Sequence, residues 1–288
     1  MHFDCSPDEP SFIPAAIYPN NQTYYEKTIL TIGLSAGLLL PSLATAQVTL
    51  DGNAPLLSPG DVATETFSYT ASAGNNLLVI ALGGRENSDF GSLYSAVSFG
   101  SQSLTHLTTV GMNGSATSTQ GMEIWYLNNP TTGSSQTIDW EIEPDASAQS
   151  GGNSDLAIYS FGNADSISVL DTAHDAESTS TTGTASADGS FILGFNYSNT
   201  GFSYPDDASG AGTYTDLTDR DGNTVSLTSG YNSNVTSGTE LTYNWGPSNQ
   251  SGSAMFEVTA IPEPDTMGML VGLAAIGMTL TRRRRMKS

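Results

Sequence analysis

The chain has 288 residues, of which 13% are charged, and its formal net charge is −21. The segment from Gln47 to Ile261 contains 23 acidic residues, two arginines and no lysine. Such a surface repels nucleic acid and anionic lipid, so a nucleic-acid-binding role is excluded. We expect an exported domain in a salty or calcium-rich medium; a merely well-solvated acidic surface is the alternative. The single cysteine, Cys5, precedes this stretch, which therefore has neither a disulfide nor a thiolate.

Residues 1–46 are interpreted as a leader followed by a signal peptide. Lys27 supplies a positive charge, an apolar stretch runs to Leu40, and Pro41 ends it. The small residues Ala44 and Ala46 then form an A-x-A cleavage site, so that Gln47 becomes the first residue of the mature chain. The polar, proline-containing segment before Lys27 is not typical of a signal peptide, and whether residues 1–26 are translated stays open.

Residues 47–260 form a Gly-, Ser- and Thr-rich domain with many short apolar or alternating runs. Strands are predicted at 77–82, 95–99, 122–127, 137–142, 156–161, 191–197, 224–228, 241–245 and 254–258. Turn-rich segments separate them, for example 128–135 and 198–212, and no sustained helical period occurs. This pattern predicts an all-β exported domain, an antiparallel β-sandwich of jelly-roll-like type.

Few side chains in this domain are candidates for catalysis. His106 is interpreted as an ordinary strand residue and His174 as a solvated loop histidine. Asp139, Glu141 and Glu143 alternate with apolar residues, which indicates the wet face of a strand rather than a pair of glycosidase carboxylates. No nucleophile elbow or zinc-protease motif is present. We therefore expect no enzymatic activity and no certain cofactor.

Two weaker candidates concern ligands. Asp219, Asp221 and Asn223 place oxygens at alternate positions around a glycine, which resembles the start of a calcium loop, although the closing glutamate is missing. A polar turn is the alternative. The tryptophans are a candidate sugar-stacking platform, with core packing as the favoured alternative. They are Trp125, Trp140 and Trp245.

Residues 261–288 end the chain with three features in a fixed order. Pro262, Glu263 and Pro264 come first, then an apolar run from Thr266 to Thr281 that predicts a short single transmembrane helix, and then an arginine block. The block consists of Arg282, Arg283, Arg284 and Arg285. By the positive-inside rule it stays in the cytoplasm, which agrees with export of the domain by the signal peptide.

This tail resembles a PEP-CTERM sorting signal. The resemblance implies processing near the Pro-Glu-Pro triplet by an exosortase, after export through the secretion translocon and cleavage by signal peptidase. It also implies an inner-membrane-anchored precursor in a Gram-negative bacterium, delivered to the cell surface or extracellular matrix. A plain membrane anchor is the alternative. Residues 76–162, with Glu123-Ile124-Trp125-Tyr126-Leu127 and the turn 130–133, also resemble a β-sandwich module of secreted bacterial proteins.

These observations predict an exported, non-enzymatic protein of the cell surface or of an exopolysaccharide-associated matrix. The alternative is a secreted carbohydrate-binding module of lectin type, assisted by calcium. The sequence leaves open the ligand, the oligomeric state and whether the tail is removed.

Overall fold

The computed structural model describes residues 47–51, 67–85, 93–112, 120–142, 155–175, 179–198, 205–209, 215–218, 226–245 and 251–262. These residues contain seventeen β-strands and no helix. Every paired strand runs antiparallel to its neighbour. The predicted all-β, antiparallel fold is therefore confirmed, and it is compatible with a β-sandwich.

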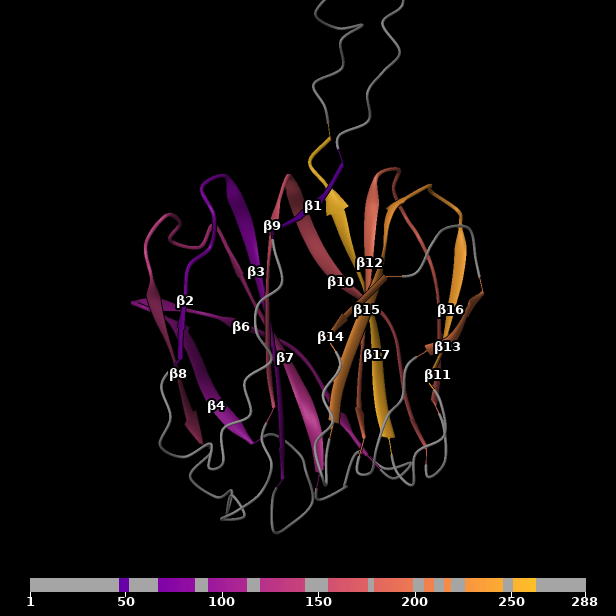
Figure 1. Ribbon diagram of the computed structural model, residues 1–288, viewed down its shortest axis with the longest axis horizontal. Helices are drawn as coiled ribbons and strands as arrows, with labels where there is room; N and C mark the ends of the chain where they lie inside the picture. The colour runs from indigo at the N-terminus through magenta and orange to yellow at the C-terminus, as the bar shows by residue number, and fades with distance from the viewer. Residues whose placement is uncertain are drawn as a thin grey trace, which may run out of the picture. The chain divides into compact units, whose positions relative to one another are not determined.

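The first half of this domain forms two sheets (Figure 1). The first inner sheet has the order β1 (Thr49–Asp51), β9 (Leu156–Gly162), β3 (Asn75–Arg85), β7 (Gln120–Asn128) and β6 (Thr105–Gly111). The first outer sheet has the order β2 (Phe67–Tyr69), β8 (Gln136–Ile142), β4 (Tyr94–Phe99) and β5 (Gln102–Ser103).

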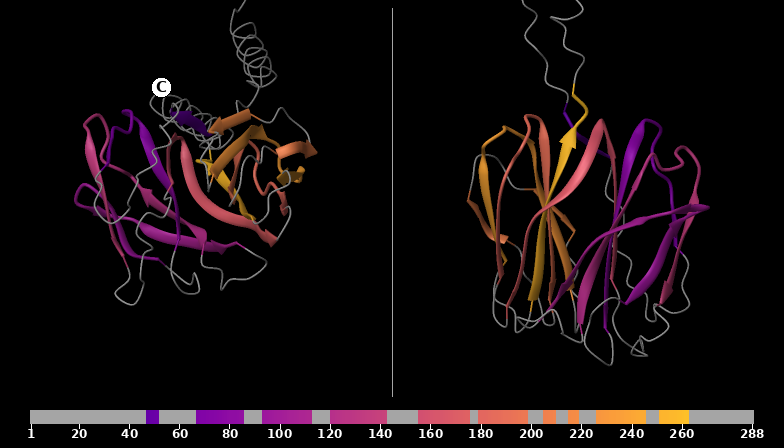
Figure 2. Two further views of the ribbon diagram at one scale, coloured as in Figure 1. Left: turned by 60° about the horizontal axis from the view of Figure 1, so that its bottom comes forward. Right: turned by 180° about the vertical axis from the view of Figure 1, so that it is seen from behind.

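The second half also forms two sheets. The second inner sheet has the order β10 (Ala164–Asp175), β17 (Ser251–Ala260), β12 (Ser190–Ser198), β15 (Ser226–Val235) and β14 (Thr215–Thr218). The second outer sheet has the order β11 (Thr179–Thr184), β16 (Glu240–Trp245) and β13 (Pro205–Ser209). Figure 2 shows the two halves side by side.

Three hydrophobic cores join the four sheets. The largest lies between the two inner sheets and contains Val79, Tyr159, Phe195 and Phe256. A second core joins the first inner and outer sheets, and a third joins the second inner and outer sheets. Because the first inner sheet is packed against an apolar core on each face, its central strand β3 needs apolar side chains at successive positions. This explains the continuous apolar run at 77–82.

The nine predicted strand segments all overlap observed strands, but several strands were not predicted. β6, β10 and β11 are rich in Ser, Thr and Asp and contain many half-buried or exposed positions. β13 lies inside the segment 198–212, which the sequence predicted as turn-rich. Strands at sheet edges need little apolar surface, so composition gives a weak signal for them.

The two halves have the same topology. Strands β1 to β4 correspond in chain order to β10 to β13, and β6 to β9 correspond to β14 to β17, while β5 has no counterpart. With this correspondence the two inner sheets have identical strand orders, and so do the two outer sheets apart from β5. We call the halves the first repeat (47–162) and the second repeat (164–260).

Backbone geometry repeats as well. Asn129 and Asn234 occupy equivalent positions and have φ values of 54° and 56°. Gly133 and Gly238, four residues later, have φ values of 74° and 81°. The amide of each glycine donates a 2.8 Å hydrogen bond to the carbonyl of an equivalent alanine, Ala71 or Ala185. The shared left-handed turns indicate an internal duplication.

The repeats pack through equivalent surfaces. The register makes Gly83 equivalent to Tyr197, because Val79 and Leu193 occupy matching positions in β3 and β12. These two equivalent residues meet each other: a Cβ added at Gly83 would lie 2.4 Å from the Tyr197 ring. Contact between equivalent positions is expected where a pseudo-twofold axis crosses an interface, so the two repeats form an isologous pair within one chain.

Candidate functional site

The predicted processing points lie at the borders of the described domain. Gln47 is exposed, and β1 begins two residues later. At the other end β17 stops at Ala260, and Ile261 (44% exposed) and Pro262 follow it. Glu263, Pro264, the arginines 282–285, Ala44 and Ala46 lie outside the described residues. Within the described residues no helix is long and apolar enough to cross a membrane.

Asn163 brings these two borders together. It connects the first repeat to the second and has a left-handed backbone, with φ of 57°. Its carbonyl accepts the Ile261 N–H at 2.9 Å, and its Nδ2 donates to the Gln47 carbonyl at 3.4 Å. Figure 1 shows β1 and the end of β17 at the same end of the domain. The predicted mature N-terminus and the start of the sorting tail are therefore neighbours.

At this end of the sheets, each repeat uses a carboxylate to hold an equivalent turn. Asp51 Oδ2 accepts the Ser72 N–H at 2.8 Å, and Glu257 Oε1 accepts the N–H of the equivalent residue, Ser186, also at 2.8 Å. Burial opposes ionisation of Asp51, but hydrogen bonds from Ser72, Ser160 and Asn75 outweigh it and hold the Asp51 pKa below its usual range. The two carboxylates come from non-equivalent strands, and both have structural partners.

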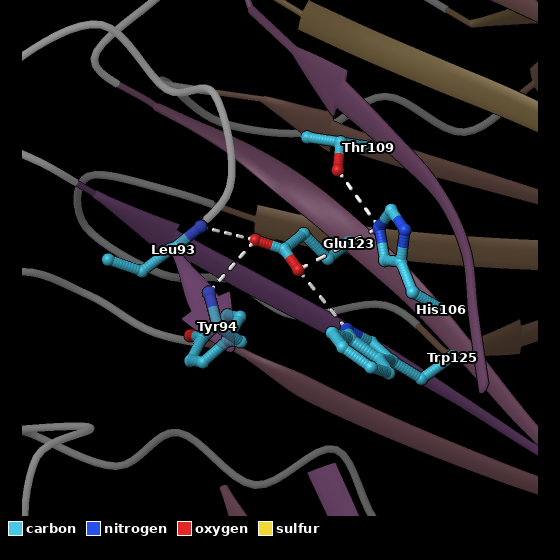
Figure 3. Close-up of polar contacts among 6 residues, drawn as sticks. All are labelled: Leu93, Tyr94, His106, Thr109, Glu123 and Trp125. Atoms are coloured by element: carbon cyan, nitrogen blue, oxygen red, sulfur yellow. Dashed lines mark hydrogen bonds and ion pairs between the residues drawn. The ribbon is translucent and has the colours of Figure 1, made fainter. Parts of the chain in front are cut away.

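Glu123 is a fully buried carboxylate between the two sheets of the first repeat (Figure 3). Its Oε1 accepts the backbone N–H groups of Leu93 and, at 3.2 Å, Tyr94, where the outer strand β4 begins. Its Oε2 accepts the indole N–H of Trp125 at 3.2 Å and lies 3.8 Å from His106 Nε2. Neither sequence pattern nor composition had marked Glu123 as a candidate. The signal in the sequence that could have identified Glu123 is a charged residue within an otherwise apolar strand.

His106 lies at the surface edge of this cluster. Its ring packs edge-on against Trp125, with 4.9 Å between centroids, and its Nε2 is 3.0 Å from the Thr109 hydroxyl. Burial lowers the His106 pKa below 6.5, partly offset by a hydrogen bond that the ring donates to the Thr108 backbone carbonyl. The equivalents of His106, Glu123 and Trp125 in the second repeat are Asp216, Thr228 and Gly230, so the cluster is particular to the first repeat.

The cluster supports structure better than catalysis. Each carboxylate oxygen of Glu123 already accepts at least one N–H group, which leaves the carboxylate poorly suited to take a proton from a substrate. The histidine is held on an edge strand by an aromatic ring and a hydroxyl. We conclude that Glu123 acts as a clamp between two sheets.

The other sequence candidates are placed as follows. Asp139 and Glu141 are exposed on the outer face of β8 and line a shallow depression of about 210 Å³ with Ser98 and Ser103, whereas Glu143 lies outside the described residues. The predicted alternation is confirmed for Ile138, which is buried. His174 is exposed in β10 and pairs with Gly252, so it belongs to a strand rather than to the predicted loop.

The tryptophans do not form an exposed platform. Trp125 and Trp245 are 6% and 1% exposed, which agrees with the favoured core interpretation. Trp140 is half-buried and stacks on Phe67, with 5.5 Å between ring centroids. Asp219, Asp221 and Asn223, the calcium candidates, lie outside the described residues, between β14 and β15. Among the residues that the structure describes, no three His, Cys, Asp or Glu side chains gather as metal ligands would.

Comparisons with family models, curated proteins and solved structures found no match.

Proposed function

We propose that the protein is an exported, non-enzymatic component of the bacterial cell surface or of an exopolysaccharide-associated extracellular matrix, and that an exosortase sorts it through its C-terminal PEP-CTERM signal. The observation that carries this proposal is the meeting of Gln47 and Ile261 at Asn163. The compact domain fills the interval between the two predicted signals, and both signals join it at one end.

This arrangement suits a precursor with two membrane-directed ends. A signal peptide and a C-terminal anchor enter the same membrane, so a domain whose ends lie together satisfies both attachments without unfolding. Among the residues that the structure describes, Ile261 is the last with a backbone hydrogen bond to the domain, and the exposed Pro262 follows it directly. Proline also disfavours further strand pairing, which keeps the Pro-Glu-Pro segment extended and accessible to an enzyme at the membrane face.

The intact mass of the protein recovered from the cell surface, with and without the exosortase, tests this proposal. We expect a chain that begins at Gln47 and ends near Pro262 to Pro264 only when the exosortase is present. A variant of the protein in which Arg282, Arg283, Arg284 and Arg285 are replaced by serine should lose its retention in the membrane and its delivery to the cell surface. A mass that includes the arginines in both strains would reduce the protein to a plain membrane-anchored one.

Carbohydrate binding is the second candidate function. It is favoured by a set of buried polar side chains in the second repeat, two of which, Asn232 and Ser253, replace Leu127 and Leu156 of the first repeat.

A further inference from the structure

The space between the second inner and outer sheets contains polar atoms without hydrogen-bond partners. We call this space the polar seam. Among the residues that the structure describes, five buried polar side-chain atoms without a hydrogen-bond partner face it. They are Thr181 Oγ1, Ser198 Oγ, Asn232 Nδ2, Trp245 Nε1 and Ser253 Oγ.

Register and packing place these side chains in one layer. Ser198 and Ser253 follow the alternation of Ile192 and Met255, which belong to the core between these sheets. Asn232 also points into the seam, because the Tyr243 hydroxyl donates to its Oδ1 at 2.7 Å. Thr181 pairs with Tyr243 and shares the orientation of Gly183, whose face meets Met255. All five side chains are at most 2% exposed.

The first repeat shows that the fold does not require polar residues here. Leu156 occupies the position equivalent to Ser253, and Leu82 the position equivalent to Asn196, beside Ser253. Both leucines belong to an apolar core. Buried polar atoms without partners cost free energy, and native proteins normally satisfy them. At these two positions the first repeat is apolar and the second is polar, so the polar residues of the second repeat point to a role other than packing.

We propose that the polar seam binds a neutral, polyhydroxylated ligand, a sugar unit, whose hydroxyl groups satisfy these atoms. The five side chains offer hydroxyls, one amide NH₂ and one indole N–H, and none carries a charge. The rings of Tyr243 and Trp245 are perpendicular, 6.1 Å apart, and lie against Gly194, so an aromatic surface borders the polar atoms. Glu257, the charged residue on the same face, is bonded to Ser186 and Ser190 at the far end of β17.

The seam is closed, since its side chains have almost no exposed surface. Binding therefore requires the second outer sheet, which has three strands, to separate from the inner sheet. The desolvation cost of the unpartnered atoms weakens this contact and lowers the energy of opening. Ligand binding should then protect amides of β11 and β16 from hydrogen exchange.

Trp245 provides a direct reporter. The chain has three tryptophans, so replacing Trp125 and Trp140 by phenylalanine leaves Trp245 as the single tryptophan, which is excited selectively at wavelengths that the tyrosines do not absorb. The full-length protein is titrated with cellotetraose and mannotetraose as neutral probes, and with an oligogalacturonate as an anionic control. We expect a saturable change in Trp245 emission with a neutral probe, none with the anionic one, and slower exchange in β11 and β16.

Ser253→Ala separates a ligand-binding role from a structural one. Removing an unpartnered hydroxyl should raise the unfolding midpoint of the sugar-free protein, while losing one ligand hydrogen bond should weaken sugar binding roughly three- to tenfold. Ser103→Ala, on the first outer sheet, is the matched control and should change neither. Destabilisation by Ser253→Ala would overturn the proposal, because it would show that the hydroxyl has a partner without sugar.

Absence of saturable binding to either neutral probe would also overturn it, as would equal binding of the anionic probe. The inference rests on the proposed delivery of the protein to a polysaccharide-containing matrix. Binding is measured on purified protein and delivery by intact mass in cells, so failure of one is distinguishable from failure of the other.

Discussion

Substituting Glu123 by glutamine tests whether one buried carboxylate holds the two sheets of the first repeat together. The carboxylate accepts N–H groups from Leu93, Tyr94 and Trp125. Glutamine keeps one acceptor oxygen, but its NH₂ group must face at least one of these donors. A hydrogen bond to a charged group contributes about 1.5–3 kcal/mol, and a buried donor left unsatisfied costs about 1–3 kcal/mol. We therefore expect Glu123→Gln to lower the free energy of unfolding by about 2–5 kcal/mol.

Urea denaturation followed by tryptophan fluorescence measures this loss, because Trp125 donates to the same carboxylate. Glu141→Gln is the matched control: Glu141 is exposed on β8, and its replacement should change the free energy by less than about 0.5 kcal/mol. If Glu123→Gln unfolds within about 0.5 kcal/mol of the unchanged protein, the clamp contributes nothing and the reasoning is refuted. Equal losses in both variants would attribute the effect to net charge instead.

Three further predictions follow from the same structure. Gly133→Ala and Gly238→Ala each place a Cβ on a left-handed backbone and should each lower the unfolding free energy by about 1–2 kcal/mol; clearly unequal urea midpoints would count against equivalent turns. The lowered pKa of His106 means that the folded protein binds its proton less readily than the unfolded chain, so stability should fall as pH drops below 6.5 towards the folded-state pKa. His106→Gln should flatten this decrease in urea midpoints measured across that range, and an unchanged pH profile would contradict it. Because the net charge is −21, the melting temperature should rise as salt increases from about 0.01 M to about 1 M, over which the Debye length shortens from about 30 Å to about 3 Å; a larger rise in CaCl₂ at matched ionic strength would indicate the predicted calcium site.

The apolar strands were predictable because both inner sheets are buried on two faces. In a chain so rich in Gly, Ser and Thr, the continuous apolar runs at 77–82 and 156–161 indicate buried central strands. The edge strands were not predictable in this way. In β6 and β11 the stability comes from backbone pairing and a few inward side chains, such as Val110 in β6, and periodicity does not detect that.

The duplication was present in the sequence but not in its overall composition. Tyr126, Asn129, Gly133 and Trp140 recur with the same spacing as Tyr231, Asn234, Gly238 and Trp245. Most of these residues mark a turn or a core position, whereas the strands between them have diverged. The resemblance to a β-sandwich module covers only 76–162, because the second repeat lacks the Glu-Ile-Trp-Tyr-Leu segment that carries it.

Candidate functional residues could be predicted from the sequence only where they form a contiguous motif. The predicted sorting signal is a linear pattern, so it can be read from the sequence alone. The polar seam combines residues from β11, β12, β15, β16 and β17, and their convergence depends on strand register across two sheets. Serine, threonine and asparagine are so frequent in this chain that their presence in a strand carries no information until burial is known.

The two repeats allow the requirements of the fold to be separated from those of function without reference to any other protein. Features that both repeats share, such as the left-handed asparagine and glycine of the equivalent turns, are needed to build the sandwich. Features that only one repeat has are not needed to build the sandwich. Glu123 stabilises the first repeat with several hydrogen bonds, whereas the polar seam leaves the second with unpartnered atoms. A departure that stabilises the protein is explained by stability alone, whereas one that destabilises it calls for another role. This contrast is the reason for proposing ligand binding in the second repeat.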